Sequence, residues 1–145
     1  MSILSQFIAA EDDEIEAIGE SLNPVEEWSG LQMRDVDTAK VATLHALLTG
    51  DLFDDAIAHY EPLYVSDGEG AMVLRLTDDL TERLAELDAE VLEDVAAELA
   101  ATEEFEVAGW EAEAITAMLA DLADLARLAD AQGQTLFVWM HPLRT

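Results

Sequence analysis

Hydrophobic residues recur at helical or strand spacing along most of the 145-residue chain. Several segments carry apolar residues three and four positions apart, which is the spacing of one face of an α-helix. Shorter segments are continuously apolar or alternate with polar residues, as strands do. The pattern predicts strands over residues 2–9, 71–76 and 134–140, and helices over about 11–22, 37–50, 77–87, 89–101 and 110–132.

These elements predict a single α+β domain over residues 1–145, with about five helices packed on a small sheet of two or three strands. Asp35 or Asp37 is expected to cap the second helix, because a short acidic side chain accepts hydrogen bonds from the first helical N–H groups. Gly50 and Gly133 stand where helices commonly end. The intervening segments 24–36, 51–70 and 103–109 carry no sustained pattern and are expected to be connectors.

Helix faces can be assigned from the same spacings. The second predicted helix turns Val41, Leu44, Leu47 and Leu48 to one side, and the longest helix carries a regular apolar stripe. Inward positions are expected at Leu80, Leu84 and Leu87 in the third helix, at Val91, Leu92, Val95 and Leu99 in the fourth, and at Ile115, Leu119, Leu122, Ala126 and Ala129 in the longest.

The predicted C-terminal strand is almost entirely apolar. Its centre reads LFVWM, residues 136–140, which is typical of a strand buried on both faces. An unpaired edge of this kind would aggregate. We therefore expect it to pair inside the sheet or across a dimer, and the sequence leaves both arrangements open.

The charge is strongly one-sided. The chain has 33 acidic and 6 basic residues, for a net charge of -27, yet 51% of its residues are hydrophobic. That apolar content predicts a folded protein rather than a disordered acidic tail. So few Lys and Arg side chains exclude direct binding to nucleic acid and disfavour anionic membranes. The acidity fits either solvation, as in a salty cytoplasm, or steering of a basic protein partner.

The composition also limits the chemistry that the protein can perform and indicates where in the cell it is expected. The chain contains no Cys, which excludes disulfides, thiolate nucleophiles and zinc sites with Cys ligands. No signal peptide or membrane-spanning run is recognised, so the expected location is the cytoplasm.

One short run resembles a known family. Residues 42–50, ATLHALLTG, are similar to the motif LHxLLTG of the YfbM-like family of small uncharacterised bacterial proteins. Other landmarks follow in the same order, including Leu76 and Thr77 at the end of a strand and Gly133 before a terminal apolar strand. The chain departs from the family at Val41, where the family tends to carry Trp. The resemblance implies an α+β fold in a bacterial cytoplasmic protein and no particular activity.

His45 is the titratable residue of this motif. Its imidazole can act as a general base with Asp51 or Asp54, or it can bond a carbonyl or carboxylate while filling a packing gap near the end of its helix. The second role is expected. A pocket for a ligand or partner is predicted around His45, Thr49, Trp28 and Tyr60, with no catalytic residue assigned.

A metal site is an alternative interpretation of the histidines. His45, His59 and His141 with Asp54 or Asp55 offer suitable ligand atoms. Their spacing matches no established ligand motif, so no metal or other cofactor is expected. Carboxylates four residues apart, such as Glu82 with Glu86 or Glu90 with Asp94 and Glu98, are interpreted as solvated helix faces.

The function expected from the sequence is that of a non-catalytic binding or accessory protein. Nucleophile, metal and phosphate motifs are missing from the sequence, which motivates this choice. Its sharpest form is an inhibitor or immunity-type protein that covers a basic enzyme or toxin. The alternative is an enzyme that uses His45 as its acid or base.

Overall fold

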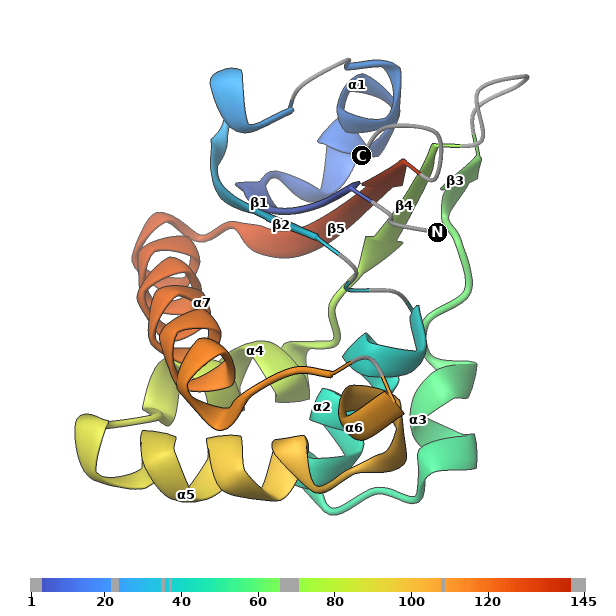
Figure 1. The fold of residues 1–145 in the computed structure, drawn as a ribbon. Helices are drawn as coiled ribbons and strands as arrows, with labels where there is room; N and C mark the ends of the chain where they lie inside the picture. Colours follow the sequence, from blue (N-terminus) through green and yellow to red (C-terminus); the bar gives the residue numbers. More distant parts are fainter. Residues whose placement is uncertain are drawn as a thin grey trace.

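An antiparallel sheet runs through the structure, a computed structural model that describes residues 4–21, 24–34, 36, 38–65, 71–107 and 109–141 (Figure 1). Within these residues the sheet has five strands in the order β2-β1-β5-β4-β3, and every neighbouring pair is antiparallel. The strands are β1 (Leu4–Ala10), β2 (Ser29–Arg34), β3 (Tyr64–Val65), β4 (Met72–Arg75) and β5 (Thr135–His141).

The prediction of two or three strands was therefore too low. The three predicted strands correspond to β1, β4 and β5, whereas β2 and β3 fall in segments expected to be connectors. Both missed strands lie at the edges of the sheet. Edge strands contact one neighbour and are partly solvated, so their sequences need less apolar content than central strands.

The C-terminal strand β5 is central and pairs with β1 on one side and β4 on the other. Phe7 of β1 and Leu74 of β4 both pair with Val138. This arrangement satisfies the backbone of the apolar run within one chain, so β5 does not need a dimer to cover its edges. The alternation of side chains also explains why both faces of β5 are buried: even and odd positions meet different cores.

Most helices cover one face of the sheet, and α1 lies on the other (Figure 1). The five predicted helices are present, together with α3 and α6, two short helices in segments that were expected to be connectors. The helices are α1 (Ile15–Glu20), α2 (Thr38–Thr49), α3 (Phe53–Ala58), α4 (Asp78–Glu86), α5 (Ala89–Ala100), α6 (Glu103–Val107) and α7 (Ala112–Gln132), with 3-10 turns η1 (Asp12–Glu14) and η2 (Pro24–Glu26).

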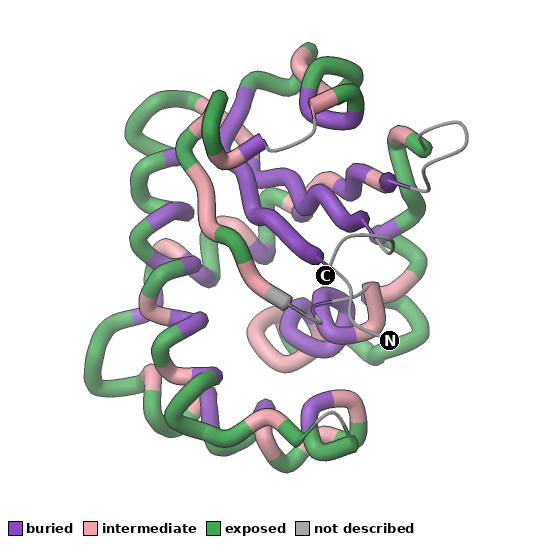
Figure 2. The backbone as a smooth tube through the Cα atoms, turned by 45° about the horizontal axis from the view of Figure 1, so that its top comes forward, coloured by how far each residue is buried: buried purple, intermediate pink, exposed green. Residues whose placement is uncertain are grey.

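The main core lies between the sheet and helices α2, α4, α5 and α7. The predicted stripe of α7 is buried there, as are Leu80 and Leu84 of α4 and Leu87 directly after it. Figure 2 shows buried central strands beside helices with exposed outer stretches. The assignment of Val91 on α5 was wrong, because 40% of this residue is exposed. Leu92, Val95, Leu47 and Leu48 pack against the core as partly buried residues.

A second, smaller core lies on the opposite face of the sheet. Phe137 and Trp139 of β5 contribute to it, with Ile18 of α1 packed among them. Trp28 and Tyr64 cover this core as partly buried residues. Trp28 also donates a hydrogen bond from Nε1 to Glu14, at 2.9 Å.

Some helix ends have standard caps, whereas α3 and α7 begin without a side-chain cap. Thr77 caps α4 by accepting a hydrogen bond from the Leu80 N–H, and Gly133 ends α7 with a φ of 67°, which favours glycine. The predicted caps Asp35 and Asp37, Leu22 of the first predicted helix and the loop 66–70 lie outside the described residues. No described helix has the length and apolar character to cross a membrane.

Candidate functional site

His45 lies in the interior of α2 with its ring almost completely buried. The residue is 1% exposed, and both ring nitrogens have hydrogen-bond partners. Nδ1 lies 2.7 Å from the hydroxyl of Tyr60, and Nε2 lies 2.7 Å from Oδ2 of Asp51. The first two turns of α2 are buried in the main core. This packing holds the ring between these two groups.

Two threonines extend this hydrogen-bond network. Thr77 Oγ1 lies 3.2 Å from His45 Nδ1 and 3.4 Å from the Tyr60 hydroxyl. Thr49 donates from Oγ1 to the His45 carbonyl at 2.7 Å, and the same oxygen accepts from the Asp51 N–H at 3.4 Å. The network thus joins α2, the segments flanking α3 and the N-cap of α4.

The ionisation states follow from these contacts. The hydrogen bond from His45 holds the pKa of Asp51 below its usual value, more than the effects of Thr49 and His59 do. Burial raises the pKa of the Tyr60 hydroxyl. At neutral pH Asp51 is a carboxylate, which can only accept, so His45 Nε2 carries the hydrogen in their bond.

His59 lies beside this network. It follows the last residue of α3, it is exposed, and its ring centroid is 5.4 Å from that of His45 with the planes tilted by 35°. One ligand atom each of His45, Asp51 and His59 all lie within 4.8 Å of one another. The structure therefore brings two imidazoles and one carboxylate together at the α2–α3 connection.

Three of the four predicted pocket residues meet here. His45, Thr49 and Tyr60 belong to one network, whereas Trp28 lies on the opposite face of the sheet with the second core. Trp28 instead lines a hollow of about 530 Å³ between β2 and α7, together with Leu31 and Leu128. The four residues do not form one pocket.

The structure brings only some of the residues considered for catalysis and for metal binding close to His45. Of the two carboxylates weighed for His45, Asp51 bonds its ring, and Asp54 is exposed in the first turn of α3. His141 lies on β5 with its ring 5.6 Å from that of Trp139, and it is not part of the His45 cluster. Both nitrogens of His45 are used internally, so proton exchange with a substrate requires the loss of one of these bonds.

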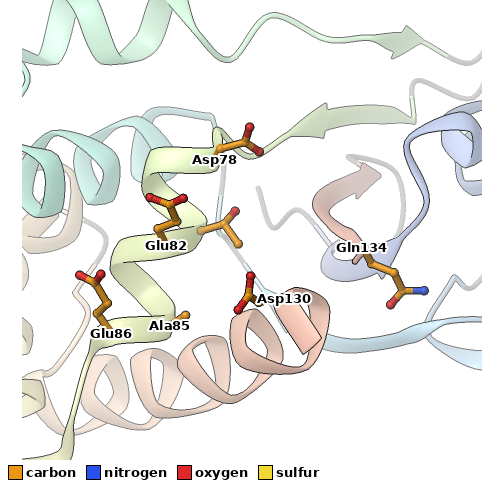
Figure 3. Close-up of a pocket in the computed structure, with 7 residues that line it drawn as sticks. Asp78, Glu82, Ala85, Glu86, Asp130 and Gln134 are labelled. Atoms are coloured by element: carbon orange, nitrogen blue, oxygen red, sulfur yellow. The ribbon is translucent and has the colours of Figure 1, made fainter. Parts of the chain in front are cut away.

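A second candidate site is a hollow lined largely by carboxylates. It has a volume of about 460 Å³ and lies between α4 and the end of α7. In Figure 3, Asp78, Glu82 and Glu86 extend from α4, and Asp130 extends from the facing end of α7. The lining residues are Asp78, Thr81, Glu82, Ala85, Glu86, Asp130 and Gln134.

The sequence carried a partial signal for this acidic hollow. Asp78, Glu82 and Glu86 are spaced by four, so they share one face of α4. The pair Glu82 and Glu86 was interpreted as a solvated face, and the facing Asp130 could not be assigned to it without the fold. No ion pair joins Glu82 or Asp130 to a basic side chain within the described ranges.

No protein-family model and no curated protein matches the sequence. A solved structure that is similar is that of YfbM from Escherichia coli, a protein of unknown function, with 17% identity and a TM-score of 0.47. The match covers 94% of this chain and 99% of that one.

Proposed function

We propose that this protein is a non-catalytic cytoplasmic binding protein whose acidic hollow receives a basic group of a partner protein. The observation that supports this most is the lining of the hollow: four of its seven residues are carboxylates, and none is basic. Like charges placed close together on a folded protein repel one another. A bound ammonium or guanidinium group would relieve that repulsion and form charge-assisted hydrogen bonds.

The local ion pairs leave this hollow negatively charged. Asp78 contacts Arg75 at 3.2 Å, and Glu86 approaches Arg83 at 4.0 Å, while Glu82 and Asp130 have no such pair among the described residues. These contacts are exposed and contribute little stability. The net charge of -27 adds long-range attraction, which accelerates encounters with a positively charged partner.

The sharpest form of the proposal is an inhibitor or immunity-type protein for a basic enzyme or toxin. Active sites that handle phosphate-containing substrates are rich in Lys and Arg, and an acidic surface can cover them. Association of this kind is steered by charge and weakens as salt rises, because mobile ions screen the attraction.

The proposal is tested by capture from the native lysate with tagged protein, followed by elution with increasing salt. The wild-type protein should retain a basic protein that elutes at moderate salt. The double variant Glu82→Gln/Asp130→Asn should lose it. Glu90→Gln/Glu98→Gln is the matched control, because it removes the same charge from exposed positions of α5.

Each outcome bears on a separate part of the proposal. Loss of capture with the first variant and retention with the control would support binding at the hollow. Equal loss with both variants would assign the effect to overall charge and remove the hollow from the proposal. If nothing basic is retained by the wild-type protein at low salt, the binding role itself is contradicted.

The enzymatic alternative rests on the bond between His45 and Asp51. A buried carboxylate-bonded imidazole is a usual part of acid–base sites, but neither of the two hollows described above is lined by His45. A folded His45→Ala protein that has lost a measurable turnover would support this alternative. Unchanged turnover would end it.

A further inference from the structure

The cluster of His45, Asp51 and His59 has the composition of a transition-metal site. It supplies two imidazole nitrogens and one carboxylate oxygen, the ligands that zinc and related divalent metals accept. We propose that these three residues bind one divalent transition-metal ion of the zinc class. This inference goes beyond the proposed partner binding and does not depend on it.

The distances suit a site that closes around the ion. The three ligand atoms lie within 4.8 Å of one another, and the His45 Nε2 and Asp51 Oδ2 atoms are already 2.7 Å apart. Ligands at about 2.0–2.2 Å from a tetrahedral zinc ion stand ~3.3 Å from each other. His59 and Asp51 are exposed, so rotation of their side chains can make this adjustment without moving the core.

The surroundings of His45 provide the orientation that a metal ligand needs. Coordination through Nε2 requires the imidazole to carry its hydrogen on Nδ1 instead. Tyr60 then accepts that hydrogen bond at the Nδ1 side, where its hydroxyl lies 2.7 Å away and is close to Thr77. A metal-bound histidine normally has a hydrogen-bond partner of this kind, which fixes its tautomer and ring plane.

The chain positions the three ligands on a short helical hairpin. His45 comes from α2, Asp51 from the connection after α2, and His59 from the end of α3. Helices α2 and α3 pack against each other through the main core, in which Ala56 of α3 is buried. The carboxylate side chain of Asp51 is 43% exposed, which gives an ion access from solvent, and three protein ligands leave a fourth position for water.

The test is a calorimetric titration of the metal-free full-length protein with Zn²⁺. The wild-type chain should bind one ion, and His59→Ala and Asp51→Asn should each weaken binding at least tenfold. Asp55→Asn is the matched control for Asp51→Asn, because it removes the same charge from an exposed position of the neighbouring helix outside the cluster. Its affinity for Zn²⁺ should equal that of the wild type.

Two further measurements separate this site from general attraction of cations to an acidic protein. Mg²⁺ in tenfold excess should leave the affinity for Zn²⁺ unchanged, because magnesium prefers oxygen ligands. Zn²⁺ should also shift the imidazole resonances of His45 and His59 in NMR spectra and leave those of His141 in place. Equal Zn²⁺ affinity in the wild type and His59→Ala, or displacement by Mg²⁺, would overturn the proposal. The variants change exposed positions, and circular dichroism verifies that they fold.

Discussion

At the scale of the residue, the bond between Tyr60 and His45 determines how the buried imidazole is held. Tyr60→Phe keeps a ring that is 2% exposed and removes the hydroxyl 2.7 Å from Nδ1. Thr77 remains 3.2 Å from Nδ1 as a substitute partner, so we expect a loss of about 1 kcal/mol in the free energy of unfolding. Urea denaturation measures it. Tyr64→Phe is the control, because the Tyr64 hydroxyl makes no hydrogen bond within the described residues, and an equal loss in both variants would contradict the prediction.

The same residues show what a sequence conveys at this scale. The position of His45 in an apolar helix, near the helix end, predicted an imidazole bonded to a carbonyl or a carboxylate, and the structure has the carboxylate of Asp51 there. Asp51 had been named, with Asp54, only as a partner of His45 in the catalytic alternative. Asp51 follows α2 directly, so chain connectivity alone keeps it near. His59 was grouped with His45 and His141 in the metal alternative, but its position beside Asp51 was not predicted, because α3 was not predicted and its length sets where His59 lies. Trp28 was misplaced for a similar reason, since the strand order decides which face of the sheet it covers.

At the scale of the element, the edge strand β2 depends on a close backbone approach at Gly30. A Cβ atom at this position would lie 2.4 Å from the carbonyl oxygen of Phe7 in β1, and a backbone atom cannot move aside cheaply. Gly30→Ala should therefore reduce the free energy of unfolding by about 2 to 3 kcal/mol. The comparison is Gly133→Ala, where a Cβ meets nothing within 4 Å and the φ of 67° alone costs about 1 kcal/mol.

The urea midpoints of the two glycine variants show whether the close backbone contact at Gly30 or the positive φ at Gly133 costs more stability. If Gly133→Ala is as destabilising as Gly30→Ala, the close approach of β1 and β2 is not what requires glycine.

The elements differ in how well they can be recognised from sequence. Long amphipathic helices such as α7 repeat their pattern over many turns and were predicted, whereas β2 and the two-residue β3 are formed by pairing with strands distant in the chain.

At the scale of the whole molecule, burial of apolar residues stabilises the folded state, whereas repulsion among the acidic residues destabilises it. The two cores bury apolar residues on both faces of the sheet, and the acidic residues remain mostly outside. Arg75, Arg83 and Arg127 form ion pairs with carboxylates at the surface, whereas the pair of His45 with Asp51 has a buried imidazole. Composition alone predicted a folded acidic protein, but the gathering of carboxylates from α4 and α7 into one hollow required the tertiary structure.

This balance predicts that salt stabilises the protein. The Debye length falls from about 30 Å at 0.01 M to about 3 Å at 1 M salt, so NaCl screens the repulsion among the carboxylates. Screening also weakens the exposed ion pairs, but these contribute little, and repulsion from a net charge of -27 should dominate. We expect the melting temperature to rise between 0.01 and 0.5 M NaCl, by about 3 °C for each 1 kcal/mol gained in the free energy of unfolding.

A variant in which Glu90, Asp94 and Glu98 of α5 are replaced by their amides should melt higher at low salt and respond less to NaCl. A melting temperature that falls with salt would show that attractive pairs outweigh repulsion, and would remove the physical basis for steering a basic partner.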